Sequence, residues 1–343
     1  MRAFVVSAPG QAGVEDVPEP EAVAGEVVVD VDRVGVCGTD VEFFTGEMQY
    51  LHDGHASYPM RLGHEWMGRV SEIGPGVDPA WLGSRVTADT MLGCQRCDRC
   101  ASGRQHVCEW RTEIGIRAGR PGALAERIAV PAWALHLLPE SVDEAAGALV
   151  EPAGNALRCV QAAEVRADQR VLVFGPGTIG LLVAMIARSQ GANVRLVGVT
   201  DESIAFAASL GFTDVGTVAD MATGEFDAVI DASHDPAVPA IAIDRVAPGG
   251  RVVFIGLAGV PSAIDSRRLV FKDATAIGVL SASPGLVGAI EVFASGEVDP
   301  HPLVAATVAL EDVAEVLQGQ RPKGSGPGPK VHVDPRLAPA GRR

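Results

Sequence analysis

The sequence predicts an α/β protein with two domains, one rich in β-strands and one built around a parallel sheet. The first 150 residues or so consist of short alternating or apolar runs divided by Gly/Pro turns, which is typical of β-structure. After that point, strand-like runs alternate with long Ala-rich segments, and this alternation predicts a parallel sheet with right-handed crossovers. The length of 343 residues also favours two domains over one.

The β-rich part shows strand-like runs and turns in a regular succession. The runs cover residues 27–31, 69–73 and 125–130, and the turns cover residues 18–20, 74–76 and 121–122. The stretch 45–61 lacks a strong period, and we interpret it as an active-site loop.

The second part has the helix and strand lengths of a βαβ fold. Residues 151–163 and 179–190 are predicted helices, and the predicted strands are 170–174, 194–199, 226–231, 251–256 and 274–280. After a Gly/Pro-rich loop at 325–329, residues 330–333 form a final strand. We therefore expect a β-rich domain of residues 1–155 and 290–343, with a cysteine lobe at about 92–110, and a parallel-sheet domain of residues 156–289.

Charge and hydropathy argue against nucleic acid and membranes as binding partners. The chain carries 28 basic and 43 acidic residues, a formal charge of −15, which argues against nonspecific binding to nucleic acid or to an anionic membrane. No apolar run approaches the roughly 20 residues of a membrane helix. Since a strand-like stretch starts at Ala3 with no targeting pattern before it, we expect a reducing cytoplasm, where the six cysteines are metal ligands or free thiols.

Four cysteines form the strongest local signal, with three at two-residue intervals and a fourth after seven more residues: Cys94, Cys97, Cys100 and Cys108. A disulfide framework would need an oxidising compartment. A c-type haem would need His where Ala101 stands, and a bacterial iron–sulfur run would place its fourth Cys after three residues and follow it with Pro, not Glu109. The spacing predicts a structural zinc cage.

A glycine-rich turn follows the predicted strand 170–174: Gly175, Pro176, Gly177, Thr178, Ile179 and Gly180. In the context of strand, turn and helix, this G-x-G-x-x-G pattern predicts dinucleotide binding. The first glycine makes the tight turn, the second lets the backbone approach a pyrophosphate, and the third lets helix and strand pack closely. The helix N-terminus then offers free N–H groups to the phosphates.

The end of the next strand bears on the choice of cofactor. Counting back from the following helix end places Gly198 where an acid would bind the adenosine ribose of NAD, with Thr200 just beyond it. Because Gly198 would not repel a 2′-phosphate, this position favours NADP over NAD. No Arg follows to hold that phosphate, however, and Asp201 would serve the ribose in a shifted register.

A second metal site does not follow from spacing alone. Cys37, His64 and Glu151 each have an ordinary interpretation: a small buried residue, a hydrogen-bonded histidine and a helix start. The sixth cysteine, Cys159, reads as a core residue. His52 and His55 are interpreted as loop histidines that are satisfied by hydrogen bonds.

Together these motifs give the chain a resemblance to a known family. Residues 34–40, the Gly63–His64–Glu65 triplet, the cysteine cage, Glu151–Pro152 and the glycine-rich turn occur in the order seen in the zinc-dependent medium-chain alcohol dehydrogenases. The resemblance covers residues 1 to about 335 and implies a GroES-like catalytic domain and a Rossmann domain. Glu151–Pro152 makes the chain look most like the polyol, threonine and sugar dehydrogenase branch.

The resemblance implies a catalytic zinc, so two zinc ions per chain, and a set of ligands. Cys37 and His64 match two ligands, and either Glu65 or Glu151 matches the third. Thr39 matches the family's proton-relay hydroxyl.

The resemblance also suggests further contacts. Glu42 stands where relatives often have the next relay His, so Glu42 either hydrogen-bonds substrate or is a solvated carboxylate. Lys330 matches a basic position that reaches the cofactor pyrophosphate. Trp66 and Asn155, with Phe43 and Phe44, are candidate substrate contacts by nearness to the ligand motifs.

The implied activity is reversible oxidation of a secondary alcohol in a polyol, sugar, cyclitol or amino alcohol, with hydride transfer to NAD(P) in a homodimer or homotetramer. Two alternatives remain open. One is a zinc-independent NADPH quinone or enoyl reductase on the same scaffold, and the other is a non-catalytic binding protein.

Overall fold

The computed structural model describes residues 1–221 and 224–338, which form two compact units. The first unit comprises Met1–Glu151 and the chain from Leu303 on, and the second comprises Pro152–Pro302. The sequence set these boundaries at 155/156 and 289/290. The later boundary lies beyond α10 (Leu286–Ala294), a helix that buries Leu286, Ile290 and Phe293.

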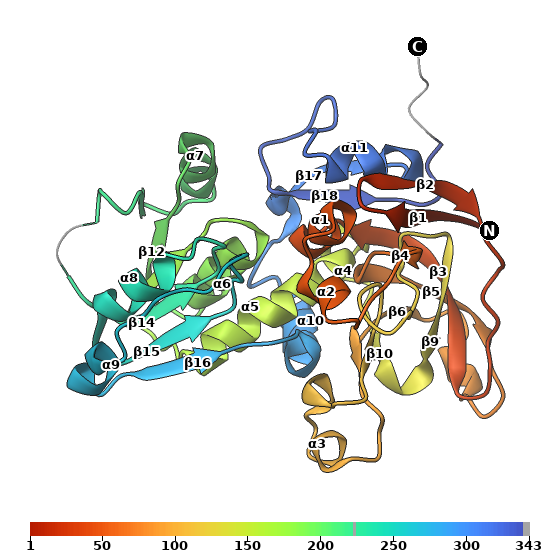
Figure 1. Ribbon diagram of the computed structural model, residues 1–343, viewed down its shortest axis with the longest axis horizontal. Coiled ribbons are helices and arrows are strands. Elements are labelled where there is room, and N and C mark those ends of the chain that lie inside the picture. Colours follow the sequence, from red (N-terminus) through yellow and green to blue (C-terminus); the bar gives the residue numbers. More distant parts are fainter. Residues whose placement is uncertain (222–223, 339–343) are drawn as a thin grey trace. The chain divides into compact units, whose positions relative to one another are not determined.

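The first unit is built around a mixed sheet with the strand order β10-β6-β5-β3-β18-β17, and β9 also pairs with β3 (Figure 1). These strands are β3 (Glu26–Gly35), β5 (Glu65–Ile73), β6 (Arg85–Ala88), β9 (Arg127–Pro131), β10 (Leu135–Leu137), β17 (Val304–Val308) and β18 (Lys330–Val333). A smaller sheet has the order β2-β1-β4, and β7 pairs with β8. Their bounds are β1 (Arg2–Ala8), β2 (Gln11–Asp16), β4 (Met60–Arg61), β7 (Met91–Leu92) and β8 (Thr112–Glu113).

The first part is rich in β-strands, as predicted, and the described residues also include short helices there. They are α1 (Gly38–Thr45), α2 (Gln49–His52), α3 (Asp98–Ala101), α4 (Glu144–Ala148) and, after the second unit, α11 (Val313–Leu317). The start of α1 has a clear cause, since the Asp40 carboxylate accepts the N–H of Cys37 at 2.9 Å. Gly46 then ends the helix in the left-handed conformation.

The second unit contains the predicted parallel sheet, with the strand order β13-β12-β11-β14-β15-β16 (Figure 1). Its elements are β11 (Arg170–Phe174), β12 (Asn193–Val197), β13 (Asp214–Gly216), β14 (Phe226–Asp231), β15 (Val246–Phe254), β16 (Thr275–Gly278), α5 (Val150–Ala162), α6 (Thr178–Ser189), α7 (Asp201–Ser209), α8 (Val238–Arg245) and α9 (Arg267–Lys272). This order is that of a doubly wound dinucleotide-binding sheet, whose switch point lies between β11 and β14. Among the described helices, none has the length and apolar character needed to cross a bilayer.

His332 on β18 is a polar residue enclosed in the first unit. Its side chain is fully buried, and neither ring nitrogen has a hydrogen-bond partner in the described part of the chain. Burial, with the nearby charges of Lys330 and Arg33, lowers its pKa to about 3, against a smaller opposing effect of Asp143. The imidazole is therefore neutral in the folded chain at neutral pH.

We expect His332 to make the protein sensitive to acid. The unfolded chain protonates this residue near pH 6.5, whereas the folded chain does so only near 3. Between these values the unfolded state binds the extra proton, so acid favours unfolding, by up to about 1.4 kcal/mol per pH unit. His332→Leu should reduce the fall in melting temperature between about pH 6.5 and pH 5, whereas the same change at exposed His52 should not. Equal acid sensitivity of the wild type and His332→Leu would contradict this assignment.

Candidate metal and dinucleotide sites

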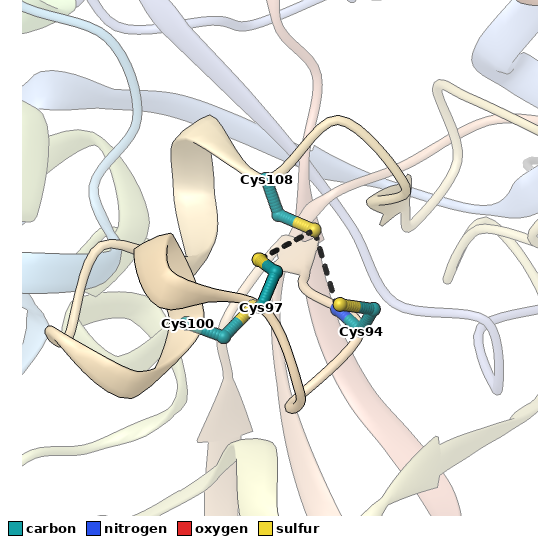
Figure 2. Close-up of side chains that lie close together, drawn as sticks. All are labelled: Cys94, Cys97, Cys100 and Cys108. Atoms are coloured by element: carbon teal, nitrogen blue, oxygen red, sulfur yellow. Dashed lines mark hydrogen bonds between the residues drawn. The ribbon is translucent and has the colours of Figure 1, made fainter.

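The four cysteines of the predicted cage converge on one point. Their sulfur atoms all lie within 4.8 Å of one another, around α3 and the chain that follows it (Figure 2). The Sγ atoms of Cys97 and Cys108 are 3.7 Å apart, and the backbone N–H of Cys94 points at Cys108 Sγ at 3.5 Å. Thiolates bound tetrahedrally to zinc at about 2.3 Å are separated by roughly 3.8 Å. The donor atoms and their spacing therefore fit a zinc ion.

The surroundings of the lobe act on its thiols in opposite directions. The backbone N–H of Arg96 lowers the pKa of Cys94 to about 6, whereas burial raises that of Cys100 to about 11. A side chain at Gly93 would collide with Cys100 Sγ and with Gln105, so the backbone comes close to the sulfurs only because residue 93 is glycine.

The structure brings a second group of metal-ligating atoms together. Cys37, His64 and Glu65 each offer one atom within 4.8 Å of the others. Cys37 follows β3, and Glu65 begins β5, which pairs with β3 so that Gly35 lies opposite Glu65. His64 and Glu65 are 6% and 2% exposed, so these donors are largely removed from water. A thiolate, an imidazole and a carboxylate form a donor set suited to catalytic zinc.

Asp40 holds the two ligand-bearing segments in place. Its carboxylate, fully buried, accepts the N–H of Cys37 at 2.9 Å and that of Gly63 at 3.2 Å. Its Oδ1 also lies 3.7 Å from His64 Nδ1, which has no hydrogen-bond partner among the described residues. Burial raises the pKa of Asp40, although the nearby His64 and the two N–H donors oppose this. A carboxylate behind a ligand histidine is a recurrent support of metal sites.

Two features fix His64 within the group. Gly63 has φ of +96°, and a Cβ there would meet the Leu124 backbone at 2.7 Å, so only glycine permits this turn into His64. Burial lowers the pKa of His64, but a hydrogen bond to Cys37 and the charges of Asp40, Cys37 and Glu151 outweigh it and raise the pKa well above its ordinary value. The ring therefore lies among anionic groups that would also attract a cation.

Lys330 lies in this group and not on an exposed surface. Its Nζ donates to Glu65 Oε2 at 2.6 Å and to the Val36 carbonyl at 3.0 Å, and its side chain is 4% exposed. Burial lowers its pKa, but Glu65 and Cys37 outweigh burial and raise it. The sequence predicted a cofactor contact, whereas the structure gives Lys330 a role in orienting Glu65.

The other carboxylate proposed as a ligand, Glu151, lies in the first turn of α5. It is 7% exposed, and its charge acts on His64, but it does not belong to the group of atoms within 4.8 Å. Asn155 is one helical turn further along α5, on the same side as Glu151.

Thr39 is in the first turn of α1, next to Cys37, and its hydroxyl has no partner in the described chain. Glu42 is half-buried on the same helix and has a polar partner.

Trp66, which was predicted to contact substrate, lies in the core of the first unit. Trp66 is 1% exposed and packs in the hydrophobic core, because it lies opposite Val34 in the β3–β5 ladder. Phe43 and Phe44, also named as substrate candidates, are 0% and 5% exposed and belong to the same core. Cys159 is fully buried, and burial raises its pKa to about 12, as expected of a core thiol.

The glycine-rich turn has the geometry that its sequence predicts. Gly175 has φ of +85°, and a Cβ there would meet the Ala232 carbonyl at 2.8 Å, at the switch point between β11 and β14. A Cβ at Gly177 would meet nothing within 4 Å, which leaves room for a phosphate group. A Cβ at Gly180 would collide with the Gly175 carbonyl, so the third glycine lets α6 approach the turn.

The strand predicted over residues 194–199 is β12, which ends earlier than predicted. The strand ends at Val197, so Gly198 is the residue directly after it, and the Thr200 side chain caps α7 by accepting the Ser203 N–H at 3.2 Å. Asp201 begins α7 and is exposed. A Cβ at Gly198 would meet Pro176 and Ser203 at 2.9 Å, so close packing also favours glycine here.

Sequence reasoning missed two groups. Asp40 is the last residue of the motif at 34–40, but no periodicity in the sequence indicated that its carboxylate would be buried between Cys37 and Gly63. Asp231 ends β14 beside the glycine-rich turn, and its Oδ1 accepts the N–H and the hydroxyl of Ser233 at 2.9 and 2.7 Å. Its position at the carboxyl end of a strand next to the switch point was the available signal.

We expect Gly35→Ala to weaken metal binding at the Cys37 group. The added methyl would collide with Glu65 Oε2 and displace a carboxylate that Lys330 holds. Displacing such a supported ligand should weaken metal affinity about 10- to 100-fold. Zinc content after dialysis against a graded chelator series measures this. Gly38→Ala is the matched control, because its Cβ meets nothing within 4 Å. Equal zinc retention by the two variants would contradict the prediction.

Comparison with known proteins agrees with this geometry. The alcohol dehydrogenase GroES-like domain matches residues 23–140, and the zinc-binding dehydrogenase model matches residues 178–294. A 2-dehydro-3-deoxy-L-galactonate 5-dehydrogenase from Pseudoalteromonas atlantica is 32% identical over 321 residues, covering 91% of this chain and 92% of the relative. An L-threonine 3-dehydrogenase from Streptomyces avermitilis is 32% identical over 338 residues, covering 93% and 94%.

Solved structures show the same architecture. A zinc-binding dehydrogenase from Sinorhizobium meliloti 1021, bound to NADP, superposes with a TM-score of 0.87 at 27% identity over 97% of this chain and 99% of that one. The galactitol-1-phosphate dehydrogenase of Escherichia coli shares the fold with a TM-score of 0.85 at 24% identity, over 98% and 100%. With its GroES-like and Rossmann parts and its threonine and sugar dehydrogenase relatives, the chain belongs to the zinc-dependent medium-chain alcohol dehydrogenase family, in the polyol and threonine branch.

Proposed function

We propose that the protein is a zinc-dependent dehydrogenase that transfers hydride between a secondary alcohol and NAD(P). The observation that carries the proposal is the group of half-buried Cys37 with buried His64 and Glu65, whose donor atoms lie within 4.8 Å of one another. The relatives support this function over a zinc-independent reductase, because they are named as dehydrogenases of threonine and of a sugar acid. The intact ligand group and the glycine-rich turn also argue against a non-catalytic binding protein.

The side chains around the Cys37, His64 and Glu65 group have distinct roles in the proposed reaction. A zinc ion held here would supply a Lewis acid for the alcohol oxygen, and a nicotinamide would supply the hydride acceptor. Asp40 fixes the backbone of Cys37 and Gly63, so the thiol and the imidazole keep their spacing. Thr39, two residues from Cys37, would accept the alcohol proton and pass it on, and its hydroxyl has no partner among the described residues. Glu42, further along α1, is a candidate hydrogen-bond partner for a substrate hydroxyl.

For the third protein ligand, the spacing favours Glu65 over Glu151. Glu65 is in the group of close donor atoms, whereas Glu151 is nearby but outside it. Lys330 donates to Oε2 of Glu65, so the other carboxylate oxygen remains for a metal. We propose two zinc ions per chain, one in each group of ligands.

We propose NADP as the preferred cofactor and a polar secondary alcohol as substrate. Gly198 directly follows β12, so the position that usually binds the NAD ribose carries no carboxylate. The Sinorhizobium meliloti structure, at 27% identity, contains NADP. The relatives act on a hydroxyl that neighbours other polar groups, in threonine and in a sugar acid, which suggests a polyol, sugar, cyclitol or amino alcohol here.

An activity screen tests this function. We expect reduction of NADP, and less of NAD, with at least one member of a panel of sugar acids, polyols, cyclitols and amino alcohols. Cys37→Ser should lower kcat/KM by more than about a hundredfold, because it replaces a metal ligand. Cys159→Ser is the matched control, since it makes the same change in the core, and it should keep kcat/KM within a few-fold.

Two results would count against the proposal. The first is full activity of Cys37→Ser, which would remove the ligand assignment. The second is a zinc content near one per chain that stays unchanged in Cys37→Ser, which would leave the cysteine cage as the sole zinc site.

We also propose that the protein forms a homo-oligomer through the free edge of the parallel sheet. β16 is the outermost strand, and its open side offers unpaired backbone groups (Figure 1). Large apolar side chains that precede it in the chain are exposed, including Leu257 at 77%, Val270 at 76% and Phe271 at 84%. An exposed edge with such apolar neighbours is a suitable surface for a second copy.

Light scattering during gel filtration tests the oligomer. We expect the wild type to have the mass of a dimer or tetramer and Phe271→Glu to shift toward the monomer, because burying an unpaired carboxylate in an interface is costly. Leu82→Glu, at a residue 57% exposed in the other unit, should leave the mass unchanged. A monomeric wild type would end this proposal.

A further inference from the structure

The loop of residues 45–59 is attached at both ends to metal-ligating segments. It begins at the end of α1, whose first turn follows Cys37, and it ends at β4, from which the chain continues to His64. Few residues of the chain therefore separate each end of the loop from a candidate ligand, Cys37 at one end and His64 at the other. The position of the loop matters for any substrate that approaches those ligands.

A second segment, residues 109–120, leaves the cysteine cage and is here called the exit segment. Its first anchor is Arg111, which donates from Nη1 to the Cys108 carbonyl at 3.2 Å and from Nε to Glu113 Oε1 at 2.7 Å. Glu113 is 1% exposed, and Arg117 Nη1 lies 3.9 Å from the same oxygen. The carboxylate is thus buried between two guanidinium groups, close to the last cysteine of the cage.

Tyr50 connects the loop to this buried carboxylate. Its hydroxyl donates to Glu113 Oε1 at 3.4 Å and accepts from Arg111 Nη2 at 3.2 Å, while the Arg117 guanidinium lies 5.6 Å from its ring centroid. The Tyr50 carbonyl accepts the N–H of His55 at 2.8 Å and that of Ala56 at 3.0 Å. Tyr50 therefore stabilises the turn of the loop through its backbone carbonyl and binds the loop to the exit segment through its side chain.

The backbone supplies a further connection between the two segments. The Ala118 N–H donates to the His55 carbonyl at 2.9 Å, and Arg117 Nη2 lies 3.4 Å from His55 Nδ1. The exit segment is also connected to His64, here called the ligand turn together with Gly63. The Ile114 N–H donates to the Thr90 carbonyl at 2.9 Å, and the Thr90 hydroxyl donates to the His64 carbonyl at 3.4 Å. The exit segment contacts the cage, the loop and the ligand turn.

We propose that Glu113 and Tyr50 are positioning residues that transmit the order of the cysteine cage to the 45–59 loop and thereby set the affinity for substrate. The inference rests on the proposed dehydrogenase function, but its structural part does not require it. The alternative, that Glu113 only neutralises two arginines, predicts no effect on a loop that starts sixty residues earlier in the chain. Glu113 Oε1 accepts hydrogen bonds from both Arg111 and Tyr50. This shared acceptor favours a link to the loop over simple charge neutralisation.

Amide exchange and kinetics together test the proposal. Tyr50→Phe and Glu113→Gln should each speed exchange of the His55 and Ala56 amides about three- to tenfold, the value of one hydrogen bond. They should raise KM by a similar factor and leave kcat within about twofold, because the metal ligands are unchanged. In the double variant the effects should not multiply, since both changes break one contact. Zinc content should match that of the wild type.

Tyr58→Phe is the matched control. It removes a tyrosine hydroxyl bond in the same loop, from Tyr58 to the Phe43 carbonyl, that does not involve the exit segment. Combined with Glu113→Gln, its effects on exchange and on KM should multiply. Cys100→Ser should lower zinc content by one ion and speed exchange at His55 and Ala56.

Specific results would overturn the proposal. Multiplying effects of Tyr50→Phe and Glu113→Gln, or loop exchange that does not change in Cys100→Ser, would show that the loop is independent of the cage. If Glu113→Gln does not fold, Arg111→Lys with Tyr50→Phe carries the same comparison. If no alcohol is turned over, the proposed function fails, whereas the exchange result still decides the coupling.

Discussion

The pairing of β3 with β5 is the constraint on which the ligand group depends. The register sets Gly35 opposite Glu65, so Cys37 lies just past the end of one strand and His64 just before the start of the other. A slip of one residue would turn Glu65 to the other face of the sheet and exchange it with His64 or Trp66. The apolar side chains of β3 and β5, including Val34 and Trp66, exclude that slip because they fill the core. Packing of apolar residues thus places the polar ones.

Charge balance explains why so many ionisable groups are tolerated in this interior. When Cys37 is a thiolate and His64 is neutral, the forms that metal ligation requires, Cys37, Asp40 and Glu65 supply three negative charges and Lys330 supplies one positive charge. Glu151 is buried close by and adds to the negative side. Such a cluster is costly unless a cation balances it. A divalent ion satisfies this need, and the pattern of the donors is consistent with zinc. Lys330 and Asp40 then serve to hold ligands and not to bind the ion.

Much of the fold was readable from the sequence because local signals and tertiary structure agree there. β11, β14 and β18 have the predicted bounds, since each is a short run of residues with strand propensity. The cysteine cage and the glycine-rich turn were predictable for another reason, namely that all of their atoms come from one short segment. The Cys37 group spans distant segments, and its spacing carries no period. It emerged only through a family resemblance, and the structure then brought Glu65 into it.

The structural settings of Trp66 and Lys330 could not be inferred from the sequence, for a common physical reason. Trp66 and Lys330 were assigned by their distance along the chain or by family position, but their roles depend on which face of a strand they occupy. Trp66 faces the core, and Lys330 faces the ligand group from β18, which pairs with β3. The same reasoning explains Glu113, a polar residue in a short two-residue strand with no motif around it. Its importance appears only when Arg111, Arg117 and Tyr50 are seen to meet at one buried oxygen. A residue whose partners come from a loop sixty residues away cannot be found by spacing, because chain distance does not determine which side chains share a buried charge.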